Sequence, residues 1–443
     1  MTAFQYAGER GSGSDELGVR GFGRTREGLS TGWKSGERGR GGWGLDGAMQ
    51  IRQIPAEERP DAMFDLAAYA FESSPWPEAD KETYARRMPF YVTATGLVAE
   101  EDGQVLAAVT ALAMRQNVRG VVHDMAGVAS VVSHPSARRR GFVRQLLTRL
   151  LEQTREQGCA VSALYPFRPS FYGHFGYVGM PRVRTATFAP EGLAHLVRAE
   201  LPGEVERLPF AAAFDEFDAL TLRLLEERHG FAVFDETRTA EFRDRTKRWV
   251  AIARSGGEVV GAVIYRIDEY GGDLIAEDLL TTGPLGRALL LQYFARHVDQ
   301  VARVIVKIGA DEVPDLWGTD FAVVTEGRTG YPKHGGPMVR LLSMTALNGL
   351  HTRADLGVTV EVINDDLLSG RYRITGEAGV LTVEETKDEP QATLTCAGIS
   401  ALAYGVLDPV EVVLRGFGQI DAEAVQVLGA LFPKQMPYLF ADF

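Results

Sequence analysis

The sequence predicts an α/β fold that is divided into more than one domain. Its 443 residues exceed what one hydrophobic core usually organises, so two or three domains are expected. Hydrophobic residues make up 45% and charged residues 24%, which is typical of a globular protein. An order of hairpin, strand and amphipathic helix occurs in the first third and recurs, more faintly, in the middle third. This recurrence predicts an internal structural repeat.

The first third alternates between strands and helices. Asp102-Gly103 is a hairpin dipeptide between two apolar runs, and Gly158 follows a clearly amphipathic helix in the manner of a C-terminal stop. The predicted order is helices over 64–71 and 80–88, strands over 91–101, 105–115 and 126–132, a helix over 141–157, a strand over 160–165 and an aromatic segment over 170–177.

The remaining two thirds differ from each other. The middle third predicts a hairpin, a strand and an amphipathic helix, over 250–254, 259–267, 273–280 and 284–297. The last third predicts alternating strands and then helices, with strands over 358–363, 370–374, 380–385 and 392–396 and helices near 399–404 and 422–431.

The net charge of −12 restricts the classes of partner. Duplex nucleic acid requires a basic face, so we expect no nucleic-acid partner, and an acidic surface suits a cationic amine substrate. No apolar run is long enough to span a bilayer and no leader pattern is present, so we expect a cytoplasmic protein with no membrane partner. Cys159 and Cys396 are the only cysteines and lack metal-ligand spacing, so no metal site is predicted.

The first 48 residues have a different composition from the rest. They are rich in glycine, serine and arginine and cannot bury enough apolar surface to offset chain entropy. We expect residues 1–48 to be a disordered extension, and one that is not native if translation starts at Met49, where a first strand begins.

A basic loop before the helix over 141–157 carries the clearest chemical signal. Arg138-Arg139-Arg140-Gly141 precedes the first helical turn, whose N–H groups have no intrahelical partners and whose dipole is positive. Such a turn binds phosphate, Gly141 allows the backbone to approach closely, and arginines add charge-assisted contacts. The plain alternative is a solvated arginine-rich turn.

Arg138–Gly141 after a strand, followed by Phe171-Tyr172-Gly173-His174-Phe175-Gly176-Tyr177, resembles the signature of the GNAT acetyltransferases. More narrowly, the chain from Met49 to Phe443 resembles the enhanced intracellular survival (Eis) family, which also ends on a phenylalanine. The resemblance implies a catalytic GNAT domain over 49–182, a degenerate second GNAT-like domain over 183–337 and a sterol-carrier-protein-like domain over 338–443. It also implies a homo-oligomer, commonly a hexamer.

The resemblance implies acetyl-CoA as cosubstrate and assigns its contacts. Backbone groups at the end of the strand would pair with the pantetheine arm and polarise the thioester carbonyl, and the loop would hold the pyrophosphate. The implied cofactor-binding residues are Val131, Val132, Ser133, Arg138, Arg139, Arg140, Gly141, Phe142, Val143, Arg144, Phe167 and Arg168. Two departures from the family pattern are Val143 at the last loop position and the absence of an arginine-glycine loop at 281–287.

The resemblance also implies catalytic roles. Tyr172 would protonate the departing CoA thiolate, since phenol and thiol pKa values, about 10 and 8.5, are close enough for transfer. The α-carboxylate of Phe443 would act as base through water, and Asp442 would contact the substrate. The implied acceptors are primary amines, including aminoglycosides and polyamines acetylated at several positions, with protein lysines left open.

Other interpretations compete with these. His174 is more consistent with a surface or packing residue than with a base, because no acidic residue is near it in sequence. Cys159 at a buried strand edge is more consistent with a core residue than with a nucleophile. The alternative function is a lipid or sterol carrier, or another binding protein, on an inactive acetyltransferase scaffold. That alternative leaves the arginine-glycine loop without a purpose.

Overall fold

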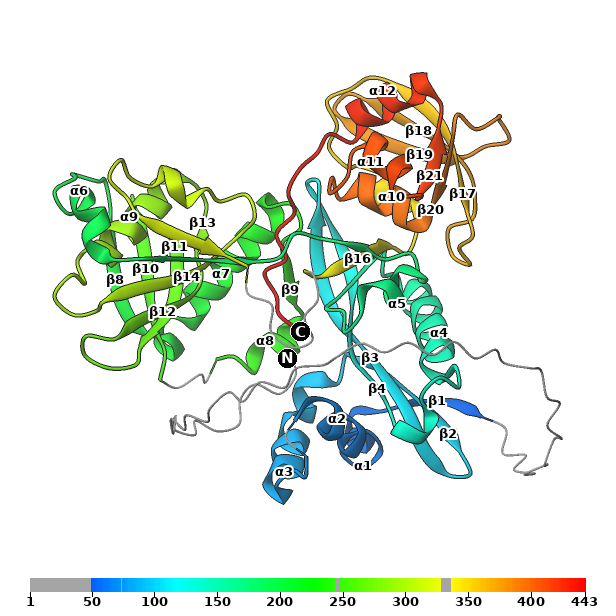
Figure 1. The fold of residues 1–443 in the computed structure, drawn as a ribbon, viewed down its shortest axis with the longest axis horizontal. Helices are drawn as coiled ribbons and strands as arrows, with labels where there is room; N and C mark the ends of the chain where they lie inside the picture. Colours follow the sequence, from blue (N-terminus) through cyan, green and yellow to red (C-terminus); the bar gives the residue numbers. More distant parts are fainter. Residues whose placement is uncertain (1–48, 73, 244–246, 328–335) are drawn as a thin grey trace, which may run out of the picture.

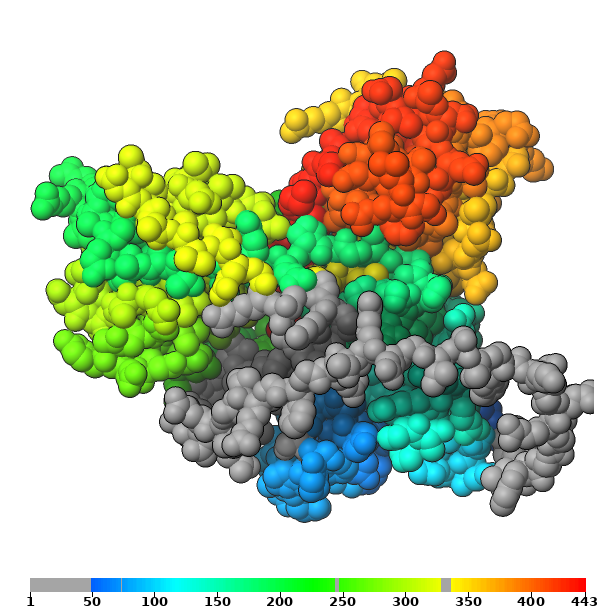
Figure 2. All heavy atoms as spheres, viewed as in Figure 1, coloured from blue at the N-terminus to red at the C-terminus, as the bar shows by residue number. Residues whose placement is uncertain are grey.

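The computed structural model describes residues 49–72, 74–243, 247–327 and 336–443, which build three β-sheets with helices packed on them (Figure 1). The prediction for residues 1–48 lies outside the described residues. Figure 2 shows the orange and red residues of the last sheet as a lobe of their own above the green and teal ones. A mixed α/β architecture is confirmed.

Sheet A has the strand order β1-β2-β3-β4-β5-β16-β6, and β9 pairs with β3. All its neighbouring strands are antiparallel except β4 and β5, which are parallel. The strands are β1 (Gln50–Ile54), β2 (Thr95–Glu101), β3 (Gln104–Val118), β4 (Val121–Ser133), β5 (Val161–Leu164), β6 (Val178–Gly179), β9 (Ala232–Phe234) and β16 (Met338–Leu341).

Sheet B has the strand order β15-β7-β14-β12-β11-β10-β8, and β13 pairs with β11. Again one neighbouring pair, β12 and β14, is parallel. The strands are β7 (Arg184–Phe188), β8 (Glu204–Pro209), β10 (Trp249–Ser255), β11 (Glu258–Ile267), β12 (Asp273–Asp278), β13 (Leu280–Thr281), β14 (Arg303–Ile308) and β15 (Val323–Glu326).

The two sheets share one topology. Three antiparallel neighbours (β1-β2-β3-β4 and β8-β10-β11-β12) are followed by one parallel neighbour (β5 and β14) that a helix connects. The connecting helices are α4 (Phe142–Glu156) and α9 (Pro284–Ala295). The order predicted from the recurrence of hairpin, strand and helix is therefore present in both sheets.

Helices cover the sheets with the apolar faces that the sequence pattern predicts. Leu146, Leu147, Leu150 and Leu151 of α4 are buried against sheet A, at the spacing of one helix face. The other helices near sheets A and B are α1 (Arg59–Ala62), α2 (Phe64–Phe71), α3 (Glu78–Arg87), α5 (Pro169–Gly173), α6 (Ala194–Val197), α7 (Phe214–Glu227) and α8 (Glu236–Ala240).

Sheet C has the order β19-β18-β17-β20-β21 and lies in the last third of the chain. Its strands are β17 (Gly357–Ile363), β18 (Gly370–Glu377), β19 (Val380–Glu385), β20 (Ala392–Thr395) and β21 (Gly418–Ile420), and its helices are α10 (Cys396–Ala403), α11 (Pro409–Leu414) and α12 (Ala422–Leu431). The capping box of Asp408 and Glu411 fixes the start of α11.

Two short strands join sheet A from distant parts of the chain. β16 lies between β5 and β6, although residues 338–341 open the range predicted for the third domain. β9 pairs with β3, although residues 232–234 belong to the range predicted for the second domain. The predicted domain boundaries remain a prediction, and sheet A draws strands from all three predicted ranges.

One predicted strand begins later than expected. The strand predicted from Tyr91 starts at Thr95, because Met88–Tyr91 form a 3-10 turn, η2. Pro89 in the first turn has the fixed φ of a helix start and no N–H to give to a strand ladder. This turn places Tyr91 where it lines a pocket described below.

The C-terminal tail runs from sheet C into the centre of the molecule (Figure 1). The Tyr438 N–H donates to the carbonyl of His229 (3.0 Å), and Phe440 stacks on Phe231 with ring centroids 4.8 Å apart. Phe443 is 6% exposed. The tail is therefore a packed segment that touches the other units.

In the part of the chain that the structure describes, no helix combines the length and apolar character needed to cross a bilayer.

Candidate active site

Strand β4 has a β-bulge near its end, close to where its pairing with β5 stops. Its register with β3 shifts between the pairs Thr110–Ala129 and Ala108–Val132, so one extra residue bulges from β4. Ser130 in this bulge has φ +50°, a left-handed conformation that is uncommon for a residue with a side chain. The parallel pairing with β5 stops earlier, at Val128 and Leu164. Beyond that pair, no pairing joins β4 to β5 in the described residues, and this unpaired stretch is called the gap below.

The backbone of β4 faces this gap at alternate residues. The His134 N–H donates to the Leu106 carbonyl of the β3 side (2.8 Å). Because N–H directions alternate along a strand, the N–H groups of Ser133 and Val131 point to the side of the gap. By the same alternation the N–H of Val132 faces β3, and its side chain is buried. Of the three predicted backbone contacts, Val131 and Ser133 are thus placed to meet a ligand between the strands.

The loop before α4 has the geometry of an anion site. Gly141 caps the helix with φ +90°, and Arg139 has φ +66°. Gln145 makes the first intrahelical bond to the Gly141 carbonyl (3.1 Å), so the N–H groups of residues 142–144 have no intrahelical acceptor. A Cβ on Gly141 would meet nothing within 4 Å. Free donors and open space therefore coincide at this helix end.

The arginines of this loop differ in their surroundings. Arg140 donates to both carboxylate oxygens of Glu101 (2.6 and 2.9 Å) and lies over the Phe142 ring. Arg138, Arg139 and Arg144 are exposed, and none has an ion pair recorded within the described residues. Arg140 is therefore the loop arginine whose side chain is held by an ion pair and a ring contact.

Tyr172 sits in α5 on the face of sheet A that α4 covers. It is 2% exposed and packs edge-on against Phe167, Phe171 and Tyr177, with centroid distances of 5.2–6.2 Å. Burial, aided by the nearby Tyr177, raises the pKa of the Tyr172 phenol well above its ordinary value. Tyr172 is therefore protonated at neutral pH, as a general acid must be.

Phe167 and Arg168 flank Tyr172 in different ways. Phe167 is exposed and tilts against Phe171, with centroids 5.4 Å apart, whereas the exposed Arg168 precedes α5 as its N-cap. His174 is exposed, as its interpretation as a surface residue predicts.

Phe443 lies on the opposite face of sheet A. Its ring packs edge-on against Tyr165, with centroids 5.4 Å apart, and the Tyr165 hydroxyl donates to the carbonyl of Ala441 (3.2 Å). A Cβ on Gly127 of β4 would lie 3.3 Å from the Phe443 ring. The last residue therefore touches the middle of β4, just before the gap.

Asp442 points elsewhere. It is in contact with solvent, yet the protein around it desolvates its carboxylate enough to raise the pKa to about 6, while Lys307 lowers it and Asp278 raises it. Lys307 lies in β14 and Asp278 in β12, both strands of sheet B. Asp442 does not line the pocket beside Phe443.

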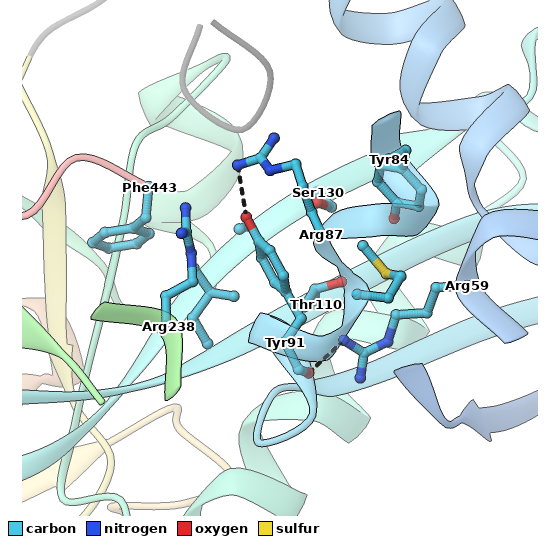
Figure 3. Close-up of a pocket in the computed structure, with 11 residues that line it drawn as sticks. Arg59, Tyr84, Arg87, Tyr91, Thr110, Ser130, Arg238 and Phe443 are labelled. Carbon is cyan, nitrogen blue, oxygen red and sulfur yellow. Dashed lines mark hydrogen bonds between the residues drawn. The ribbon is translucent and has the colours of Figure 1, made fainter. Parts of the chain in front are cut away.

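An open pocket lies between Phe443 and the bulge of β4 (Figure 3). It is lined by Arg59, Tyr84, Arg87, Met88, Tyr91, Thr110, Leu112, Ala129, Ser130, Arg238 and Phe443. The sequence analysis found only Phe443 among these residues. The others come from α1, α3, η2, β3, β4 and α8, and no short motif connects them.

The residues predicted as acid and base, and the pocket, all pack on sheet A. Tyr172 lies on one face, and Phe443 and the pocket lie on the other, while the gap between β4 and β5 separates them. In the described ranges, no group of three or more His, Cys, Asp or Glu side chains is placed to hold a metal ion.

Comparisons with known proteins agree with this geometry. Residues 50–179 match the acetyltransferase (GNAT) domain family. An uncharacterised N-acetyltransferase of Streptomyces coelicolor is 27% identical over 387 residues, which cover 81% of this chain and 90% of that protein.

Two further likenesses concern Eis proteins. N-acetyltransferase Eis of Mycobacterium tuberculosis is 32% identical over 129 residues, which cover 28% of this chain and 31% of that protein. The crystal structure of Eis1 from Mycobacterium abscessus superimposes with a TM-score of 0.71 and 18% identity, over 89% of this chain and all of that one. The latter likeness is one of fold.

Proposed function

Since this chain is a GNAT N-acetyltransferase that resembles the Eis enzymes, we propose that it transfers acetyl from acetyl-CoA directly to a primary amine at the gap between β4 and β5. The observation that carries the proposal is the gap itself. It opens beside the free helix end at Gly141 and lies between Tyr172 on one face and Phe443 on the other.

Residues on two elements bind acetyl-CoA in this proposal. The N–H groups at the start of α4 and the exposed Arg138, Arg139 and Arg144 hold the pyrophosphate. The backbone N–H groups of Val131 and Ser133 donate to the pantetheine arm and to the thioester carbonyl, where negative charge develops. Phe167 and Arg168 also contact acetyl-CoA in this proposal.

The transfer forms a C–N bond and breaks the C–S bond of the thioester. The amine must first lose the proton of its ammonium form, and the terminal carboxylate of Phe443 accepts it through water. As the amide forms, the nitrogen releases its second proton to solvent, and Tyr172 gives its own proton to the departing thiolate. The protein forms no covalent bond to the acetyl group.

The rest of the chain supports this site structurally. We take sheet B to be a second, degenerate acetyltransferase copy, because it repeats the topology of sheet A without the basic loop. Sheet C is the proposed sterol-carrier-like unit, and it delivers the tail that ends at Phe443. Assembly into a hexamer remains an expectation, which light scattering on the purified protein tests.

A carrier function has less support. It requires an apolar cavity in the sheet C unit to hold the lipid. It also gives no role to the free helix end at Gly141.

The test measures CoA release from acetyl-CoA with a panel of primary amines, beginning with the aminoglycosides and polyamines that the Eis resemblance implies. Tyr172→Phe should lower turnover by about 10²-fold, since general acids typically contribute 10²–10⁴-fold. Its acetyl-CoA affinity, measured by calorimetry, should match that of the wild type. Phe171→Leu, which changes a neighbouring ring without removing a proton, is the control. Unchanged turnover in Tyr172→Phe would remove the proposed acid.

A further inference from the structure

Arg59 is a buried cation that forms no ion pair in the described residues, although the charge of Glu57 acts on it from a distance. It is 3% exposed and lines the pocket beside the β4 bulge. Its guanidinium donates to the carbonyls of Tyr91 (3.0 Å) and Ala94 (2.5 Å), and its Nε is buried with no hydrogen-bond partner there. Burial lowers the pKa of Arg59. Carbonyls neutralise none of its charge, so this pocket wall favours an anion.

The neighbouring lining residues extend this character. Arg87 and Arg238 also line the pocket, and the carboxylate of Glu241, behind them, contacts both. Figure 3 shows the three arginines around Tyr91, with Phe443 beside Arg238. Among the described residues, those that line the pocket include three arginines and no aspartate or glutamate. Phe443, the last residue of the chain, also lines the pocket.

This arrangement opposes a polycationic acceptor. The net charge of −12 belongs to the whole surface, whereas the acceptor meets the pocket wall. A second or third ammonium group entering beside Arg59 would be repelled at short range, where the low dielectric strengthens the effect. An anionic group there would instead gain charge-assisted hydrogen bonds, and guanidinium groups fit carboxylates and phosphates alike.

We propose that the preferred acceptor is a primary amine that also carries an anionic group, a carboxylate or a phosphate, bound at the pocket wall that Arg59 forms. The amine then lies toward Ser130 and the terminal carboxylate of Phe443, beside the gap between β4 and β5. The assignment of substrate class rests on the proposed acetyl transfer, and the anion-binding wall is testable without it.

The experiment compares matched acceptors on the wild-type protein. L-lysine is paired with cadaverine, which lacks the carboxylate, and glucosamine 6-phosphate is paired with glucosamine. The anionic member of at least one pair should show a kcat/KM at least 10-fold higher, and which pair does so separates carboxylate from phosphate. Calorimetric binding of the same compounds to the protein with CoA should show the same preference. Equal values, or preference for cadaverine and spermidine, would overturn the proposal.

Variants test whether Arg59 causes the preference for anionic acceptors. Arg59→Met should bring the ratio within the preferred pair to near one, and Arg59→Lys should retain part of it. Arg119→Met is the matched control, because Arg119 is equally buried and its guanidinium donates to the carbonyls of Ala403, Leu402 and Pro433, away from the pocket. Thermal unfolding verifies that each variant is folded, and the Lys variant keeps the test open if Arg59→Met is not.

The outcomes separate the two proposals. If no amine is acetylated but anionic amines still bind more tightly and Arg59→Met loses that difference, acetyl transfer fails and the anion-binding wall stands. If amines are acetylated without any anionic preference, acetyl transfer stands and the wall fails. If Arg119→Met loses the preference as fully as Arg59→Met, the assignment to the pocket wall is wrong.

Discussion

Five consecutive strands have the same order in sheets A and B, but the two sheets differ at the place where a ligand would enter sheet A. In sheet A, the parallel pairing of β4 with β5 ends at Val128, before the bulge. In sheet B, the pairing of β12 with β14 continues past the corresponding irregularity to Asp278, and the Leu279 N–H still donates to the Lys307 carbonyl (3.0 Å). Sheet B is therefore still hydrogen-bonded between its two parallel strands at the position where this pairing in sheet A has ended.

The helices that follow show the same contrast. Gly141 before α4 has φ +90°, and its missing side chain leaves open space. Gly283 before α9 has an extended backbone, and Pro284 removes one of the free N–H groups. A Cβ on Gly286 would lie 2.0 Å from the Val260 carbonyl, so this glycine allows the helix to pack tightly on β11. Glycine leaves open space at the helix start in sheet A and allows close packing of the helix in sheet B.

The comparison separates what maintains a fold from what maintains a site. Apolar strands and an amphipathic helix suffice for the topology, because burial of their apolar faces is all that the sheet requires. A few loop residues decide whether the same topology leaves backbone donors free. Substitutions in sheet A should therefore abolish features that sheet B lacks.

The largest expected effect follows removal of Phe443, since only sheet A receives the chain terminus. Deleting this residue displaces the terminal carboxylate from the pocket, and turnover should fall by about 10²–10³-fold, within the range of a general base. Phe443→Leu keeps the carboxylate and should retain most activity with some loss of stability. Steady-state CoA release across pH 6–9 measures both. Normal turnover in the deletion variant would exclude the carboxylate as base.

A smaller effect is expected from Gly141→Ala, which makes the helix start of sheet A less able to accept phosphate. The KM for acetyl-CoA should rise about 10-fold, and strain at positive φ should cost about 1 kcal/mol of stability. Gly158→Ala is the matched control, because Gly158 ends the same helix with φ +101° and also has open space around it. It should lose similar stability without a change in KM. A KM shift of equal size in both variants would contradict the phosphate role.

The smallest effect concerns stability and tests how sheet A is joined to the sheet C unit. His229 precedes β9, is 5% exposed, accepts from the Arg119 N–H at Nδ1 (3.0 Å), and its Nε2 lies 3.0 Å from the Tyr404 carbonyl. Burial lowers its pKa from 6.5 to about 4, although the hydrogen bond to Tyr404 opposes the shift. The unfolded chain therefore binds more protons below pH 6.5. The stabilisation is complete above pH 6.5 and is lost as the pH falls toward 4.

The expected loss is about 1–3 kcal/mol, which follows from roughly 1.4 kcal/mol per pKa unit. Thermal unfolding midpoints between pH 4 and 8 measure it, and His229→Gln should flatten the dependence in the lower half of this range. An identical pH profile for the wild type and the variant would show that this histidine does not join the sheets in an acid-sensitive way.

The elements with strong periodicity were predictable. The helix over 64–71 coincides with α2, and the helix over 422–431 coincides with α12, because apolar spacing reports directly which face is buried. The strand predicted from Tyr91 was wrong at its start, since the local effect of Pro89 outweighed the apolar pattern. β9 and β16 escaped prediction as members of sheet A, because pairing with a distant strand leaves no local signal.

By itself, the sequence determined the α/β class, the repeated topology, and the basic loop with Gly141 before its helix, because these depend on neighbours within a few turns of chain. Only the tertiary structure decided the acceptor pocket, which brings Arg59, Arg238 and Phe443 together from three distant segments. It also decided that the wall of this pocket is cationic in a protein of net charge −12. Charge at a site depends on which few side chains share a small volume, and chain folding alone sets that.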